Sequence, residues 1–327
     1  MKNFIIRVKK KIENIIREIY FHYKLIVKKF ILFINSYRLK KLPDFSEVTI
    51  IVRHEGMGFF AFLNYYLYIT KYLESLNFYP NIILQSSNYS DESHNFDLLY
   101  NRFQPQEKMN NFSSQKKLTI TITDLKEILP PNIGMSIAEA SLIQKRLLVP
   151  SKTILDLVDS YIKTEIGGNF FAVHWRGTDK QTEAPPINLK QIILKIEQLL
   201  DKELITSTTC YITSDEESKV KDLKIAIEEQ FRNIKVIYRS NTLRSSTSIP
   251  IFLASTNSAD KVAQIGDEAL FECLIFSRAS CLIKTASILS GWSAIFNPEL
   301  PIYFLNASYK DTTWFPESEL ILRQKLI

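Results

Sequence analysis

Short apolar runs rich in β-branched residues alternate along the chain with longer segments of helical periodicity. The first unit consists of a strand at 47–52, a glycine-containing turn at 53–60, a helix at 61–78 and a strand at 80–86. A strand, a helix and a strand in this order predict a right-handed crossover between parallel strands. The β-branched run at 118–125 predicts a further strand. The first part of the chain is therefore expected to be an α/β domain.

A second alternating series follows residues 135–164, whose helical periodicity is interrupted at Pro150 and which we interpret as a bridge between two domains. The series contains strands at 169–174, 210–217, 235–240, 280–285 and 301–306, and helices at 188–202, 217–231, 267–277 and 287–296. Strands that alternate with helices in this way predict a parallel sheet covered on both faces. We expect an α/β protein with two Rossmann-like domains.

The predicted elements divide the chain into four segments. Residues 1–45 form a basic amphipathic helical segment, 46–150 a first Rossmann-like domain, 151–310 a second Rossmann-like domain, and 311–327 a helical tail. Ligands of doubly wound sheets bind beyond the carboxyl ends of the strands. The residues that directly follow each strand are therefore the candidates for a site.

Positive charge is concentrated at the start of the chain. Residues 1–41 contain 12 Lys and Arg but only Glu13 and Glu18, whereas the whole chain has a formal net charge of +6. Their spacing gives a helix one apolar and one basic face. Three interpretations are open: attachment to an anionic membrane surface, a nucleic-acid arm, or a helix packed on the protein. We favour the membrane surface and expect no nucleic-acid partner, because residues 42–327 contain no nucleic-acid-binding motif.

The charged and sulfur-containing residues limit where the protein is expected to work. Lysines interrupt every long apolar run, so we expect neither a membrane span, which needs about 18 apolar residues or more, nor a cleavable signal. The three cysteines have no paired spacing, which disfavours a disulfide framework and favours a reducing compartment. The four histidines form no HxxH or HExxH spacing, so no catalytic metal is expected. We expect a cytoplasmic protein, peripheral on the inner face of the membrane.

Charged and hydroxyl-bearing side chains follow three strands of the second domain. They are His174, Arg176, Thr178, Asp179, Lys180 and Glu183 after the first strand, Ser214, Asp215, Glu216 and Glu217 after the second, and Thr285, Ser287 and Ser290 after the fourth. An arginine fork neutralises a diphosphate leaving group through bidentate hydrogen bonds without a cation. Arg176 is the candidate for this role; alternatively, Arg176 and Asp179 form a structural ion pair.

Two further features suggest chemistry. Glu183 is a candidate general base for an acceptor hydroxyl, or else a solvated loop carboxylate. Gly56 and Gly58, in RHEGMGFF, would let the backbone approach a phosphate or sugar at the start of a helix. The turn lacks the third glycine of the dinucleotide fingerprint, and no acidic residue ends the second strand, which disfavours a dehydrogenase.

The segment AVHWRGTDKQTEA, at 172–184, resembles the HxRxTDK…TEA motif of the fucosyltransferase superfamily that includes the α1,6-fucosyltransferases and bacterial nodulation fucosyltransferases. The segments at 210–224 and 267–298 are similar to two later segments of that family, in the expected order. The resemblance implies a GT-B arrangement, with GDP-fucose bound mainly by the second Rossmann-like domain and the acceptor by the first. It also implies transfer with inversion and without a metal.

The resemblance assigns roles around the first motif. It implies that His174 lies against the nucleoside and that Arg176 holds the diphosphate. Thr178, Asp179 and Lys180 belong to the same nucleotide-sugar-binding loop. Glu183 becomes the candidate catalytic base.

It also assigns roles in the later segments. Asp215 would support the nucleotide pocket, and Glu272 stands where the family usually has an aspartate that reads guanine. Ser287, Ile288 and Leu289 stand where the family places two serines and a glutamine, and Ser290 is a candidate substitute for phosphate contacts. These exchanges lie where the identity of the donor should be read.

The residues and the resemblance together predict an inverting, metal-independent glycosyltransferase. We expect it to transfer fucose from GDP-fucose to a hydroxyl of a glycan or lipid-linked glycan. Two alternatives are open: a non-catalytic nucleotide- or glycan-binding module of the same fold, and a transferase that uses another nucleotide sugar. The exchanges at Glu272 and in the serine loop favour the binding module.

Overall fold

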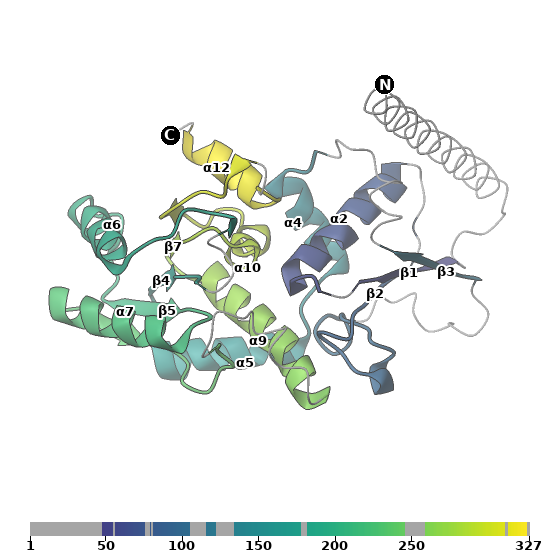
Figure 1. The fold of residues 1–327 in the computed structure, drawn as a ribbon, viewed down its shortest axis with the longest axis horizontal. Coiled ribbons are helices and arrows are strands. Elements are labelled where there is room, and N and C mark those ends of the chain that lie inside the picture. The colour runs from purple at the N-terminus through teal and green to yellow at the C-terminus, as the bar shows by residue number, and fades with distance from the viewer. Residues whose placement is uncertain are drawn as a thin grey trace, which may run out of the picture.

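The computed structural model shows an α/β protein with two parallel sheets, as the sequence predicts (Figure 1). It describes residues 48–54, 56–75, 79, 81–104, 116–121, 134–177, 182–245, 259–310 and 313–325. The amphipathic segment at 1–45 and the residues Glu55, Thr178, Asp179 and Lys180 lie outside the described residues.

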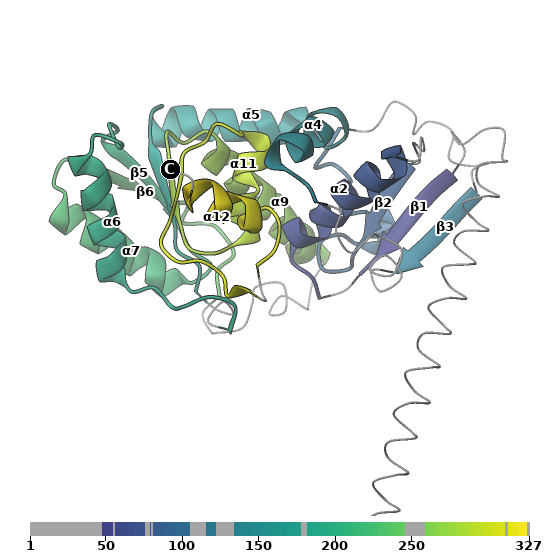
Figure 2. The same cartoon turned by 90° about the horizontal axis from the view of Figure 1, so that it is seen from above.

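The first half is built on a parallel sheet with strand order β2-β1-β3. Its strands are β1 (Val48–Arg53), β2 (Asn81–Gln85) and β3 (Lys116–Thr121). Helix α2 (Phe59–Ser75) connects β1 to β2 and lies between this sheet and the second half of the molecule (Figures 1 and 2). The predicted strand–turn–helix–strand unit is confirmed, with the helix starting two residues earlier, at Phe59.

The second half is a parallel sheet with strand order β6-β5-β4-β7-β8. The strands are β4 (Phe171–His174), β5 (Thr209–Thr213), β6 (Lys235–Ile237), β7 (Leu282–Lys284) and β8 (Ile302–Phe304). The chain adds β5 and β6 on one side of β4 and then β7 and β8 on the other. The strand order therefore reverses between β4 and β7, and the carboxyl ends of these two strands flank the crevice in which doubly wound sheets bind ligands.

Helices cover both faces of this second sheet. Helices α6 (Leu189–Asp201) and α7 (Glu217–Gln230) pack on the outer face of the sheet, which points away from the first half (Figure 2). Helices α9 (Ala259–Ser277), α10 (Ile288–Gly291) and α11 (Ser293–Phe296) pack on the inner face, which points toward the first half. Two predictions need correction. The helix predicted at 267–277 begins at Ala259, and the helix predicted at 287–296 consists of the short helices α10 and α11.

The bridge between the halves is helical and breaks at Pro150, as predicted. Helix α4 (Ile137–Leu147) ends before the proline and α5 (Lys152–Tyr161) starts after it. Ser136 and Ser151 cap the two helix starts by accepting hydrogen bonds from backbone N–H groups. Helix α4 packs against both α2 and α11, so the bridge contacts both halves.

A single hydrophobic cluster extends across the interface of the two halves. The Phe60 ring, from α2, lies 5.3 Å from the Trp292 ring, and Trp292 is fully buried. The buried Arg102 guanidinium donates to Asp267 and to the Ala263 carbonyl of α9. The aromatic contact holds α2 against the second half, and the satisfied buried cation holds the segment after β2 against α9.

The C-terminal helix α12 (Glu317–Lys325) packs on the second half, beside α4 (Figure 1). Lys284, at the end of β7, forms an ion pair with Glu317, and the two side chains are 0% and 2% exposed. The Ile137 N–H, at the start of α4, donates to the Glu319 carboxylate. The segment predicted as a helical tail is thus joined to the second sheet by a buried charge pair.

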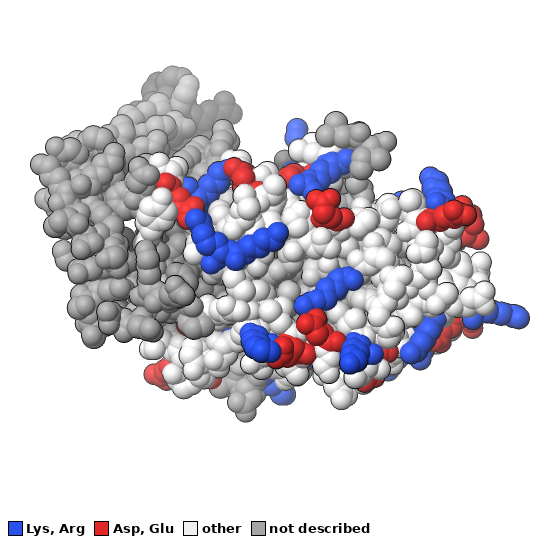
Figure 3. Space-filling view, turned by 180° about the vertical axis from the view of Figure 1, so that it is seen from behind, with Lys and Arg blue, Asp and Glu red and all other residues white. Residues whose placement is uncertain are grey.

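The face of the molecule seen in Figure 3 carries no large region of a single charge within its described part. On the face seen in Figure 3, basic and acidic side chains are interspersed over the described part of the molecule. Among the described helices, none combines the length and hydropathy that a membrane crossing requires.

We predict that Glu317→Gln lowers the free energy of unfolding by about 3–5 kcal/mol, because it removes the negative charge opposite the buried Lys284 ammonium. The double variant Lys284→Met/Glu317→Leu should recover most of this loss. Urea denaturation measures both effects. Asp156→Asn, which breaks the exposed Lys152–Asp156 pair, is the matched control and should change stability by less than about 1 kcal/mol. An equal effect of the buried and the exposed substitution would contradict the prediction.

Candidate functional site

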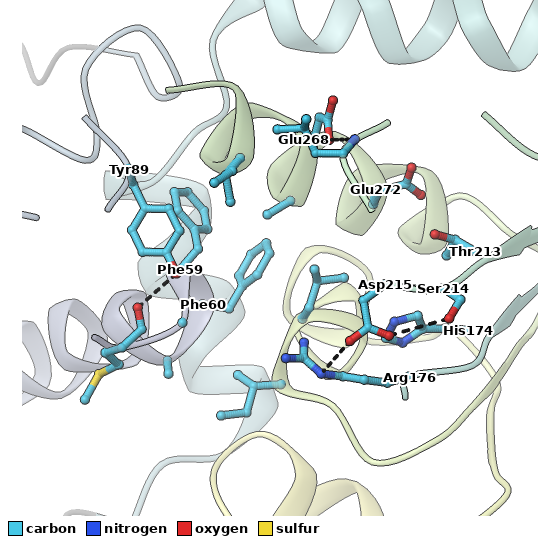
Figure 4. Close-up of a pocket in the computed structure, with 18 of the residues that line it drawn as sticks. Phe59, Phe60, Tyr89, His174, Arg176, Thr213, Ser214, Asp215, Glu268 and Glu272 are labelled. Carbon is cyan, nitrogen blue, oxygen red and sulfur yellow. Dashed lines mark hydrogen bonds and ion pairs between the residues drawn. The ribbon is translucent and has the colours of Figure 1, made fainter. Parts of the chain in front are cut away.

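A cavity of about 430 Å³ lies at the point where the strand order of the second sheet reverses (Figure 4). Both halves of the molecule contribute to its walls. The first half supplies Gly56–Ala61 and Tyr89, and the second half supplies His174, Arg176, Glu183, Thr213, Ser214, Asp215, Thr242, Leu243, Ile265, Glu268, Ala269, Glu272, Ile288, Leu289 and Trp314. Its size is that of a small-molecule site.

Strand alternation explains why His174 and Arg176 face this cavity. Phe171 and Val173 pack under α6 and α7 on the outer face, so Ala172 and His174 point to the inner face. Trp175 returns to the outer cluster, and Arg176 again lines the cavity. The end of β4 therefore places the His174 and Arg176 side chains on the cavity side of the sheet.

Asp215 orients the loop that carries Arg176. One of its carboxylate oxygens, Oδ1, accepts a 2.9 Å hydrogen bond from the Gly177 N–H, and the other, Oδ2, lies 3.7 Å from Arg176 Nε. The Arg176 N–H donates to Thr285 Oγ1 at 2.8 Å. Side chains that follow β5 and β7 thus hold the arginine that follows β4, and Figure 4 shows the contact with Asp215. The ion-pair alternative from the sequence concerned Asp179, which lies outside the described residues.

Gly177 lies close to the ends of two charged side chains behind the arginine. A Cβ built at this position would lie 1.9 Å from Glu216 Oε1 and 2.0 Å from Lys219 Nζ. These two groups form an ion pair at the start of α7, and the Lys219 ammonium lies over the Trp175 ring. The sequence Trp-Arg-Gly therefore matches the packing of its loop on α7.

His174 is held as a neutral imidazole. Its side chain is buried, and Nδ1 lies 2.8 Å from Ser290 Oγ. Burial lowers the pKa of His174 to about 3, and the Arg176 and Lys284 charges act in the same direction. The imidazole adds no positive charge to the cavity near neutral pH, so Arg176 supplies the positive charge on this wall.

Ser287 and Ser290 lie behind the cavity wall. Both are buried, and Ser290 contacts His174 and the Ser287 carbonyl. The cavity surface at this point is formed by Ile288 and Leu289. The proposed ligand contacts of the two serines therefore stay predictions, while Ser290 has a visible role in positioning His174.

Glu272 faces the cavity from α9 and is bound on both oxygens. It accepts a 2.7 Å hydrogen bond from the Tyr211 hydroxyl and lies 3.5 Å from Arg239 Nη1. Burial raises the pKa of Glu272, and the Arg239 charge opposes this rise. One turn earlier, Glu268 accepts a hydrogen bond from the Leu243 N–H. The two carboxylates hold the loop that follows β6 against the cavity.

The glycine turn lies opposite these groups. Gly56 has φ +77°, a conformation that favours glycine, and no described atom lies within 4 Å of a Cβ built at Gly56 or Gly58. The Tyr89 hydroxyl donates to the Met57 carbonyl at 2.9 Å and fixes the turn (Figure 4). Gly58 is thus open toward the cavity side rather than packed.

Several cavity residues were not identified from the sequence. Thr242 and Leu243 follow β6 and could have been found by the rule that selects residues after strands. Tyr89 and Trp314 come from segments without hydrophobic periodicity, so no sequence signal marked them. Three His, Cys, Asp or Glu side chains placed to hold a metal are not found among the described residues, and metal independence stays a prediction.

We predict that protonation of His174 destabilises the fold in acid. The unfolded chain binds this proton near pH 6.5, whereas the folded protein binds it only near pH 3. The free energy of unfolding is therefore unaffected by His174 above about pH 6.5 and falls as the pH is lowered from there toward pH 3. The slope is at most about 1.4 kcal/mol per pH unit. Urea denaturation between pH 7 and pH 4 should show a flatter pH dependence for His174→Gln than for the unsubstituted protein. Identical pH dependence would contradict a buried neutral imidazole.

Fold and cavity together define an α/β protein with two parallel sheets and a polar site at the switch point of the second sheet. No family model matches the chain, and no curated protein matches it in sequence. Similar solved structures include POFUT1 in complex with GDP-fucose, with 12% identity and a TM-score of 0.46 over 81% of this chain and 99% of that chain.

Two further similar structures are fucosyltransferases. NodZ α1,6-fucosyltransferase soaked with GDP-fucose has 11% identity and a TM-score of 0.45, covering 77% of this chain and 93% of that chain. A variant of Arabidopsis thaliana FUT1 in complex with GDP has 10% identity and a TM-score of 0.45, covering 82% of this chain and 72% of that chain. Each likeness is one of overall fold.

Proposed function

We propose that this chain is a glycosyltransferase that transfers fucose from GDP-fucose to a hydroxyl of a glycan or lipid-linked glycan, with inversion and without a metal. The observation that carries the proposal is the position of Arg176. It lines a cavity between the two halves, at the switch point of a doubly wound sheet, and Asp215 and Thr285 orient its loop. The HxRxTDK-like segment supports the choice of donor.

A diphosphate leaving group requires a positive charge that is in place before the bond breaks. Arg176 is 20% exposed, and Asp215 engages the Nε side of its guanidinium. An oriented guanidinium binds phosphate oxygens through charge-assisted hydrogen bonds. Because the orienting contacts already exist in the protein, little reorganisation is needed when negative charge develops on the diphosphate.

The opposite wall suits a phosphate or sugar. Gly56 and Gly58 line the cavity directly before α2, where backbone N–H groups and the helix dipole favour negative charge. The absence of a Cβ at Gly58 permits close approach of a ligand to the backbone. The Arg176 wall and the glycine wall together suit a nucleoside diphosphate.

Glu183 is the proposed base. The residue lines the cavity, and its backbone carbonyl accepts a 2.8 Å hydrogen bond from the Tyr309 N–H. In the proposed step, Glu183 takes the proton of the acceptor hydroxyl while the hydroxyl oxygen attacks the anomeric carbon. The bond from this carbon to the diphosphate oxygen breaks, and the electron pair leaves with GDP. Attack on the face opposite the leaving group inverts the anomeric carbon.

The proposal places the protein in the cytoplasm, at the inner face of the membrane. The charge of residues 1–41 supports this placement. The acceptor would then be presented at the membrane surface. No nucleic-acid partner is expected.

A second candidate function is a binding module of the same fold without catalysis. Glu272 is engaged by Tyr211 and Arg239, and Ile288 and Leu289 form an apolar wall in place of hydroxyl and amide groups. These features favour recognition over phosphate chemistry at this wall. Binding of the nucleotide sugar without turnover or hydrolysis distinguishes the module from the enzyme.

We predict that Arg176→Ala weakens binding of GDP-fucose at least about tenfold, because a charge-assisted hydrogen bond to a phosphate contributes about 1.5–3 kcal/mol. Titration calorimetry with GDP-fucose, UDP-glucose and ADP-glucose measures this loss and compares the donors. Arg232→Ala, which removes an exposed arginine outside the cavity, is the matched control. The proposal fails if none of the three donors binds, or if both variants bind equally well. Tighter binding of UDP-glucose or ADP-glucose would replace GDP-fucose as the donor.

We predict that Glu183→Gln lowers kcat about 10²- to 10⁴-fold, because the amide cannot accept the acceptor proton. The dissociation constant for GDP-fucose should stay within about threefold, since a lost base changes the chemical step more than ground-state binding. A GDP-release assay with mixed glycans measures turnover. Glu229→Gln, on the exposed side of α7, controls for the loss of a carboxylate. Undiminished turnover in Glu183→Gln would exclude Glu183 as the base.

A further inference from the structure

Trp314 differs from the other two tryptophans of the chain. Trp175 and Trp292 are buried in the hydrophobic clusters, whereas Trp314 is 42% exposed and lines the cavity. A large aromatic side chain that is half open at a cavity has apolar area available for a ligand. The proposed transfer chemistry assigns it no role.

Contacts with both halves of the molecule hold the backbone around Trp314 in place. The Trp314 carbonyl accepts a hydrogen bond from the Ser318 N–H at 3.0 Å. The next carbonyl, of Phe315, accepts a 2.6 Å hydrogen bond from Asn64 Nδ2 of α2. Glu317 forms the buried ion pair with Lys284 of β7. An exposed ring on a backbone held in this way loses little conformational freedom when a ligand stacks on it.

The same segment contacts the loop of the proposed base. The Tyr309 N–H donates to the Glu183 carbonyl at 2.8 Å, and Thr313 Oγ1 donates to the Tyr309 carbonyl at 2.9 Å. Asn306 Nδ2 donates to the Pro185 carbonyl at 2.6 Å. The chain that leads to Trp314 therefore runs beside the Glu183 loop, whereas Arg176 and Asp215 follow the central strands of the sheet.

We infer that Trp314 is the platform of the acceptor subsite, on which a pyranose ring stacks and presents a hydroxyl to Glu183. The inference rests on the proposed function and names the acceptor class as a ring-form sugar. A pyranose has an apolar face of C–H groups and a polar rim of hydroxyls. The indole of Trp314 would stack on the C–H face, and the Glu183 carboxylate would accept a hydrogen bond from a hydroxyl of the rim.

Saturation-transfer NMR on the full chain saturated with GDP tests this inference. The probes are the methyl pyranosides of glucose, galactose and N-acetylglucosamine, with sorbitol as an open-chain control. We expect saturation of the ring C–H protons of at least one pyranoside and none of sorbitol. The signal should fall at least about threefold in Trp314→Ala and be partly retained in Trp314→Phe, because a smaller ring keeps part of the stacking area.

Two controls separate stacking from other effects. Tyr79→Ala removes an aromatic side chain that is 56% exposed and does not line the cavity, and it should leave the signal unchanged. Calorimetry of GDP with Trp314→Ala tests whether the ring belongs to the nucleotide instead. A tenfold loss of GDP affinity without a change in the pyranoside signal would overturn the inference.

The remaining outcomes distinguish this inference from the proposed function. If GDP binds but the pyranoside signal is absent or independent of Trp314, the acceptor platform is wrong and the proposed donor site stands. If the pyranoside signal depends on Trp314 but GDP does not bind, the sugar subsite stands and GDP-fucose is excluded as the donor.

Discussion

The buried amide of Asn64 joins three segments that are distant in the sequence. Its Oδ1 accepts a 2.8 Å hydrogen bond from Trp292 Nε1, and its Nδ2 donates to the Phe315 carbonyl at 2.6 Å. Asn64 is 2% exposed, so a lost partner would leave a buried polar group unsatisfied. This one side chain couples α2, the α10–α11 corner and the C-terminal segment. The cavity depends on that coupling, because each of the three segments supplies part of its wall.

Among the described residues that line the cavity, Arg176 is the one Lys or Arg, and the other charged groups are arranged around it. His174 is neutral, the carboxylate of Glu272 is engaged by Tyr211 and Arg239, and Asp215 holds the loop of Arg176. A cation whose orienting contacts are already formed needs little rearrangement to bind a negatively charged leaving group. The apolar residues Ile288, Leu289 and Trp314 complete the walls. Leaving-group stabilisation and sugar recognition would thus occupy different walls of one cavity.

Much of the fold could be predicted from the sequence because its strands are short apolar runs and its helices are periodic. The rule that ligands bind after parallel strands identified His174, Arg176 and Asp215, which the structure brings together. The amino-terminal part of α9, from Ala259, was missed because its first residues lack a clear apolar stripe.

Residues whose positions depend on tertiary packing could not be predicted. Tyr89 reaches the cavity through its hydrogen bond to Met57, and Trp314 through the anchoring of α12 on Lys284. The directions in which the side chains of the serine loop point could not be predicted for a related reason. Within the single turn of α10, Ser290 contacts His174, whereas Ile288 and Leu289 lie on the cavity surface.

The most direct test of the central claim is a structure of this chain with GDP bound. We predict that the diphosphate oxygens lie within hydrogen-bonding distance of the Arg176 guanidinium, with the nucleoside between His174 and α9. A diphosphate bound away from Arg176, or a nucleotide outside the cavity at the switch point, would contradict it.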